Sequence, residues 1–137
     1  MGKAPSVASA TRHPGGLLLV VDDDDLVREV VATVLRSEGF EVRTAGSGAA
    51  ALEAIRSEAF HLVLMDVQMP GMDGWTALAT LRERGCDTPV VMMSGYATEA
   101  EALHRGAAGF LSKPFDHARL VEAVSRWATP AFGAAAG

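Results

Sequence analysis

Five residues that could do chemistry each stand at the end of a short apolar run. Asp22 and Asp23 follow the first run, Asp66 and Ser94 follow two later ones, and Lys113 follows the last. Carboxylates gathered in one place repel one another, and one would keep its proton unless a cation relieved the repulsion. A site made only of oxygen ligands suits Mg²⁺, and Mn²⁺ could substitute for it.

Such a set of residues fits phosphoryl transfer. That reaction needs positioning and charge neutralisation more than covalent chemistry from the protein. Asp66 is the predicted nucleophile and therefore the phosphoacceptor. Lys113 would pair with the Asp66 carboxylate before the reaction and with a phosphoryl oxygen afterwards. The Ser94 hydroxyl would donate a hydrogen bond to another phosphoryl oxygen.

The elements that must position these residues alternate along the chain. Apolar runs and alternating patterns predict strands, and apolar residues at helical spacing predict helices. Strands are expected over 17–21, 40–44, 61–65, 89–93 and 108–111, and helices over 26–35, 49–57, 75–84, 98–105 and from Asp116 to Trp127. Five β-α units with short connections predict an open parallel sheet with helices on both faces. The carboxyl ends of its strands share one edge, where ligands bind in such sheets.

Several other residues receive structural interpretations. Asp24 and Asp25 are read mainly as an acidic helix start, Asp73 as a turn and helix cap, and Asp116 as the cap of the last helix. Trp127 shares a helical face with apolar residues, which favours a place in the core.

Length and composition are those of one globular domain. The chain has 137 residues and a formal charge of −5, which offers nucleic acid no basic face. The apolar run over 17–21 is too short to span a membrane. The lone Cys86 excludes an internal disulfide. We expect a soluble cytoplasmic protein with a flexible leader over 1–16, a folded domain over 17–128 and a flexible tail over 129–137.

The motifs resemble those of response-regulator receiver domains of two-component signalling. The run Val20 to Asp24 resembles the opening of their acidic pocket, and Leu64 to Gly74 is similar, almost letter for letter, to their phosphorylation motif. Ser94-Gly95 and Lys113-Pro114-Phe115 complete the set. The resemblance covers about 17–128. It implies a flavodoxin-like, doubly wound, five-stranded parallel sheet of strand order 2-1-3-4-5.

By this resemblance, Asp66 accepts phosphate from a histidine kinase, a histidine phosphotransfer protein or a small phosphodonor. Asp23, Asp66 and the main-chain carbonyl of Gln68 would ligate the metal, with Asp22 acting mainly through water. The domain would be a signalling phosphoacceptor, not an enzyme. It would be a monomer or weak dimer with no membrane contact and no direct contact to nucleic acid.

The resemblance also implies a conformational switch. Phosphate would draw the Ser94 hydroxyl inward, and the Phe110 ring would follow into the vacated space. This shift toward an active conformation would alter contacts with a protein target. The Lys113–Pro114 peptide bond is expected to be cis.

Two features depart from the usual family pattern or add to it. The stretch from Ser94 to Lys113 is shorter than usual by roughly one helical turn, which predicts a short or reoriented fourth helix. In this it is more similar to receivers attached to hybrid histidine kinases. Tyr96 lies two residues beyond Ser94, and we hypothesise that its ring shields the acyl phosphate from water.

Two other functions compete with this reading. A haloacid-dehalogenase-like phosphatase would use Asp22 as nucleophile and Asp24 as general acid. That reading leaves the motif around Asp66 unexplained, and the chain is short for that family and shows no cap domain. A phosphate-independent interaction module with the same fold would be indicated by missing pocket residues, and none is missing.

Overall fold

The structure is a computed structural model that describes residues 16–128. It contains five strands, β1 (Leu17–Val21), β2 (Glu41–Ala45), β3 (Leu62–Asp66), β4 (Val90–Ser94) and β5 (Gly109–Ser112). Its helices are α2 (Asp25–Ser37), α3 (Gly48–Ser57), α4 (Gly74–Glu83), α5 (Glu99–His104) and α6 (His117–Ser125). The predicted tail and, apart from Gly16, the predicted leader lie outside the described residues. No described helix is long and apolar enough to cross a bilayer.

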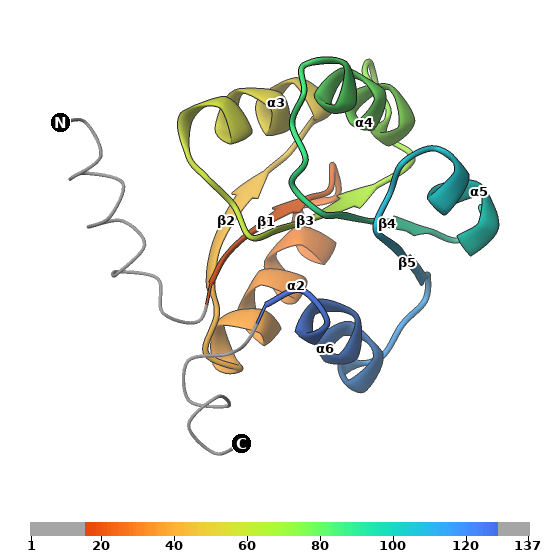
Figure 1. Cartoon of the computed structure of the whole chain (residues 1–137). Coiled ribbons are helices and arrows are strands. Elements are labelled where there is room, and N and C mark those ends of the chain that lie inside the picture. Colours follow the sequence, from red (N-terminus) through yellow and green to blue (C-terminus); the bar gives the residue numbers. More distant parts are fainter. Residues whose placement is uncertain (1–15, 129–137) are drawn as a thin grey trace, which may run out of the picture.

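The five strands form one parallel sheet in the order β2-β1-β3-β4-β5, as the resemblance implied (Figure 1). The register aligns the strand ends. Val21 pairs with Met65, Asp66 pairs with Met93, and Ser94 pairs with Ser112. The order reverses between β1 and β3, because β1 is followed by β2 on one side and by β3 on the other. Ligand sites of doubly wound sheets lie at this switch point, beyond the carboxyl ends of the strands.

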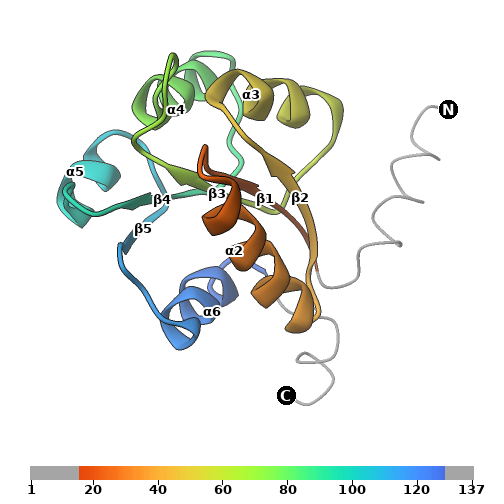
Figure 2. The same cartoon turned by 180° about the vertical axis from the view of Figure 1, so that it is seen from behind.

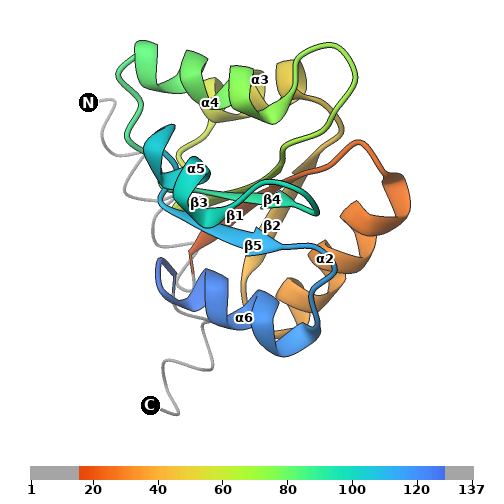
Figure 3. The same cartoon turned by 90° about the vertical axis from the view of Figure 1, so that its right-hand side faces the viewer.

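Helices cover both faces of the sheet, so that the molecule has three layers (Figure 3). Alternate residues of β1 point to opposite faces. Leu17 and Leu19 belong to the core shared with α3, α4 and α5. Leu18 and Val20 belong to the core shared with α2 and α6, the two helices seen together on one side of the sheet in Figure 2. Because both faces are covered, β1 is apolar throughout, as a central parallel strand requires.

Each described helix begins after a side chain that accepts a hydrogen bond from a backbone N–H of its first turn. These capping residues are Asp24, Ser47, Asp73, Thr98 and Asp116. Such a cap contributes about 1 kcal/mol. The predicted caps Asp73 and Asp116 and the helix start at Asp24 are confirmed. The helix after Ser94 has only six residues, which confirms that it is short.

The predicted burial of Trp127 is wrong. Its side chain is 40% exposed. Helical spacing places Trp127 in phase with Leu120 and Val124, which are buried. However, α6 ends at Ser125 with Arg126 as its C-cap, and Trp127 lies in the turn beyond the helix, where it lines a surface cavity with Glu122 and Arg126.

Candidate functional site

The carboxyl edge of the sheet gathers the predicted site residues because every strand runs the same way. Asp22 and Asp23 follow β1, Asp66 and Ser94 are the last residues of β3 and β4, and Lys113 follows β5. One carboxylate oxygen from each of Asp22, Asp23 and Asp66 can be chosen so that all three lie within 4.8 Å of one another. The structure therefore brings Asp66 together with two adjacent acidic residues that lie far from it in the sequence.

Lys113 bridges two of these carboxylates. Its Nζ lies 2.9 Å from Oδ2 of Asp22 and 3.1 Å from Oδ1 of Asp66. The pairing with Asp66 was expected, and the pairing with Asp22 was not. The Lys113–Pro114 peptide bond is cis, as expected.

Buried polar side chains are concentrated at this edge of the sheet. Within residues 16–128, the buried polar or charged residues are Asp22, Asp66 and Ser94, at 1%, 7% and 2% exposure. Burying a charge is costly unless it is paired. Three polar residues buried at one edge indicate a site for which the fold gives up some stability.

Burial and the charges of the cluster shift two pKa values. Burial raises the pKa of the Asp66 carboxyl above its ordinary value, Lys113 opposes this rise, and the charges of Asp22 and Asp23 add to it. Burial alone would lower the pKa of the Lys113 ammonium, but its hydrogen bonds and charge interactions with Asp22 and Asp66 raise it. The ammonium therefore keeps its charge at neutral pH.

The loop after β1 holds Asp22 rigidly. Oδ1 of Asp22 accepts a hydrogen bond from the backbone N–H of Asp24 (3.0 Å). Oδ1 of Asp24 in turn accepts hydrogen bonds from the N–H groups of Leu26 and Val27 (2.9 and 3.2 Å). Asp24 thus serves as a helix cap, which does not favour the general-acid role that a dehalogenase-like phosphatase would give it. Arg28, which sequence reasoning missed, contacts the Asp22 carbonyl.

The cluster fits a hard divalent cation. Its donors are carboxylate oxygens, with no nitrogen or sulfur among the acidic trio, and this is the donor set that Mg²⁺ and Mn²⁺ prefer. Asp23 is exposed and, with Gln68 and Tyr96, lines an open cleft of about 460 Å³. The cleft leaves room for water beside the Asp23 carboxylate. Tyr96 is 60% exposed at its rim.

The remaining predicted residues lie near the cluster in different settings. Gln68 is exposed in the loop after β3. Oγ of Ser94 accepts hydrogen bonds from the N–H groups of Tyr96 and Ala97, both at 3.0 Å. Phe110 lies in β5, half-buried, and packs against the core on the α3–α4–α5 side of the sheet.

Known proteins resemble this chain in sequence and in fold. The family model described as response regulator receiver domain matches residues 18–125. The chain is 41% identical over 112 residues to the regulatory protein AtoC of Escherichia coli, covering 80% of this chain and 24% of AtoC. It is 42% identical over 108 residues to the transcriptional regulatory protein FixJ of Azorhizobium caulinodans, covering 77% of this chain and 51% of FixJ. The chain thus spans about a quarter to a half of these relatives.

Solved structures agree with the sequence relatives. The chemotaxis protein CheY4 of Vibrio cholerae aligns with a TM-score of 0.75 at 31% identity, covering 81% of this chain and 97% of CheY4. The receiver domain of NtrX from Brucella abortus aligns with a TM-score of 0.74 at 39% identity, covering 80% of this chain and 95% of that domain. The fold, the acidic edge and these matches together place the chain in the family of response regulator receiver domains, the phosphoacceptor domains of two-component signalling.

Proposed function

We propose that Asp66 is the residue that accepts the phosphoryl group, with a divalent cation bound beside it. The observation that carries this proposal is the position of Asp66. It lies at the switch point of the sheet, within reach of two further carboxylates and 3.1 Å from the Lys113 ammonium. The cation and Lys113 would offset the charge that a phosphoryl group brings to this edge.

Asp66 is better suited than Asp22 to act as the nucleophile. Both Asp22 oxygens are occupied, one by the Asp24 N–H and the other by Lys113. Oδ2 of Asp66 accepts no hydrogen bond from the described residues. No fully buried side-chain oxygen in that part of the chain lacks a hydrogen-bond partner, so Oδ2 must reach solvent. Oδ2 is therefore the oxygen of Asp66 that a phosphoryl donor can approach.

The residues divide the remaining work. Asp23, Asp66 and the carbonyl of Gln68 would hold Mg²⁺ or Mn²⁺, with Asp22 acting through water. The bound ion would neutralise charge on the transferring group. A carboxylate oxygen of Asp66 forms the new O–P bond while the P–N bond to the donor histidine breaks and its electron pair returns to the imidazole. Lys113 then moves its hydrogen bond to a phosphoryl oxygen.

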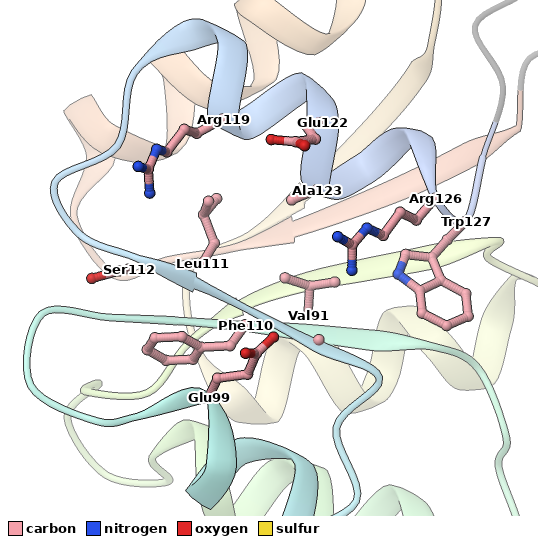
Figure 4. A pocket seen from close by; sticks show the side chains of 11 residues that line it. Val91, Glu99, Phe110, Leu111, Ser112, Arg119, Glu122, Ala123, Arg126 and Trp127 are labelled. Carbon is pink, nitrogen blue, oxygen red and sulfur yellow. The ribbon is translucent and has the colours of Figure 1, made fainter.

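The domain would pass its signal through Ser94 and Phe110. The Ser94 hydroxyl accepts two backbone hydrogen bonds and still has its own proton to donate. A phosphoryl oxygen on Asp66 would attract that proton, and Phe110 would adjust to the displaced loop. Phe110 also lines a cavity of about 320 Å³ between β5, α5 and α6, so its movement would reshape that surface (Figure 4).

We further propose a histidine kinase or histidine phosphotransfer protein as donor, a protein as the target, and the cytoplasm as the compartment. The net charge of −5 supports a protein target over nucleic acid. In this role the domain assists only its own phosphorylation and dephosphorylation and turns over no other substrate.

Intact-mass spectrometry after treatment with acetyl phosphate tests the proposal. The wild-type chain should gain the mass of one phosphoryl group with Mg²⁺ and much less without it. Asp66→Asn should gain none, and Asp87→Asn, which changes an exposed residue of the loop before β4, should behave like wild type. A modified residue mapped by peptide analysis to Asp22 would favour the phosphatase reading. Absence of any mass gain in the wild type would refute the proposed function.

A further inference from the structure

Arg28 lies in the first turn of α2 and makes three hydrogen bonds to residues of the segment that leads from β1 into this helix. Its side chain is 17% exposed. Nη1 donates to the main-chain carbonyl of Asp22 (2.8 Å), and Nη2 donates to Oδ1 of Asp25 (2.6 Å). Its backbone N–H donates to the carbonyl of Asp24 (2.9 Å). Asp25 is the first residue of α2, so its bond to Nη2 orients the planar guanidinium on the helix, while the bond from Nη1 to the Asp22 carbonyl ties the loop to α2.

The contact with Asp22 fixes the peptide plane that leads into Asp23. The N–H of Asp22 donates to the carbonyl of Ala45 at the end of β2 (3.2 Å). With its carbonyl held by Arg28, Asp22 is anchored on both sides of its α-carbon. Because a peptide group is planar, holding this carbonyl also sets the direction in which Asp23 continues. Gly46 packs closely here, since a Cβ built on it would lie 3.2 Å from Nη1 of Arg28.

The two cations near the site therefore differ in what they touch. Lys113 meets the carboxylate oxygens of Asp22 and Asp66 directly. Arg28 meets a carbonyl of the same loop and a carboxylate, Asp25, that lies outside the acidic trio. Arg28 contacts none of the carboxylates of the acidic trio, while it fixes the backbone that carries Asp22 and Asp23.

From this geometry we infer that Arg28 is a positioning residue of the metal site, which sets the orientation of Asp22 and Asp23 for a divalent cation. The inference rests on the proposed function. Residues that orient metal ligands typically raise metal affinity by about 10–100-fold. The charge of Arg28 would act in the opposite direction, because a nearby cation repels Mg²⁺. If removal of the Arg28 side chain lowers Mg²⁺ affinity, positioning outweighs charge repulsion, and if it raises Mg²⁺ affinity, charge repulsion is the larger effect.

The test compares Mg²⁺ affinity in Arg28→Ala and Arg56→Ala by isothermal titration calorimetry at fixed ionic strength. Arg56 is a matched control. It forms the same kind of ion pair one turn along a helix, with Glu53 at 2.8 Å, and it lies on the exposed surface of α3. We expect Mg²⁺ to bind about tenfold more weakly to Arg28→Ala, and as in wild type to Arg56→Ala. Equal or tighter binding by Arg28→Ala would overturn the inference.

Arg28→Lys provides a second reading that does not depend on whether Arg28→Ala folds. Lysine keeps the charge and loses the planar fork, so Mg²⁺ should bind several-fold more weakly. In the metal-free protein, the amide hydrogens of Asp23 and Asp24 should exchange faster in Arg28→Lys than in Arg56→Lys. Wild-type affinity together with unchanged exchange would overturn the inference.

These outcomes distinguish the inference from the proposed function. If the wild-type chain binds no Mg²⁺ and accepts no phosphate, the proposed function fails and the inference fails with it. If the wild type binds Mg²⁺ and is phosphorylated while the Arg28 variants bind Mg²⁺ like their Arg56 controls, only the inference fails.

Discussion

Gly74 is the position where a single methyl group should disturb the phosphoacceptor strand most directly. It is the first residue of α4, it is buried, and its N–H donates to the carbonyl of Val67 (2.8 Å). A Cβ on this residue would overlap the carbonyl oxygen of Asp66. It would also lie 2.8 Å from Cε of Met92 and 2.9 Å from Cα of Val67. The Met92 methyl can move aside, but the other two atoms belong to the backbone that carries Asp66.

Gly74→Ala should therefore push α4 away from β3 and weaken the Gly74–Val67 hydrogen bond. Overpacking of this kind costs about 1–3 kcal/mol, and the weakened bond about 1 kcal/mol more. The greater helix propensity of alanine returns at most about 1 kcal/mol. The expected net loss is about 2 kcal/mol, which corresponds to a fall in Tm of roughly 8 °C for a domain of this size.

Thermal unfolding followed by circular dichroism in metal-free buffer measures this effect, with Gly109→Ala as control. The nearest atom to a Cβ on Gly109 is Cγ2 of Val91, at 3.4 Å, so the control should unfold within about 2 °C of wild type. Phosphorylation, assayed well below both transitions, should be slower in Gly74→Ala because Asp66 is displaced. A Tm for Gly74→Ala within 2 °C of wild type would show that the backbone at Asp66 is not constrained by α4 as described.

Three further predictions concern the charged edge. Burial raises the pKa of Asp66 in the folded state, so the free energy of unfolding without metal should fall as pH rises through that pKa. Asp66→Asn should remove this pH dependence and raise the free energy of unfolding at pH 7 by on the order of 1 kcal/mol. Urea unfolding at a series of pH values measures both effects, and the same pH profile in wild type and Asp66→Asn would refute the prediction. Lys113→Met should cost about 1–3 kcal/mol without metal, because the carboxylates of Asp22 and Asp66 lose their partner, and saturating Mg²⁺ should recover part of this in the same urea titration; no loss of stability would show that the ion pairs contribute nothing. Tyr96→Ala should speed dephosphorylation several-fold if the exposed ring shields the acyl phosphate, and an equal or slower decay of the phosphorylated mass would refute that role.

Sequence reasoning was most successful where the deciding interactions are local. The helix caps at Asp73 and Asp116 follow from side chains that bond to backbone N–H groups three residues on. The central strands follow from apolar runs whose length matches a buried strand. Helical phase, by contrast, misled the prediction for Trp127, because α6 ends before the pattern does.

Contacts between distant segments were beyond the sequence. Lys113 and Asp22 are 91 positions apart, and their pairing depends on how far β5 and β1 advance along the common edge. The Asp22 carbonyl is a backbone group, so no residue type marks it as the acceptor for Arg28. The two hydrogen bonds accepted by Ser94 depend on the course of the loop after β4.

The residues of the candidate site could be named from the order of the amino acids, since a parallel sheet brings every strand end to one edge and the polar residues stand at those ends. How that edge is held together became visible only in the folded domain. Lys113 spans two carboxylates, Arg28 fixes the loop from behind, and Gly74 admits α4 against the backbone of Asp66. The difference lies in the sequence separation of the interacting groups. Residue type and spacing encode local geometry, whereas distances of about 3 Å between remote atoms arise from the packing of the whole domain.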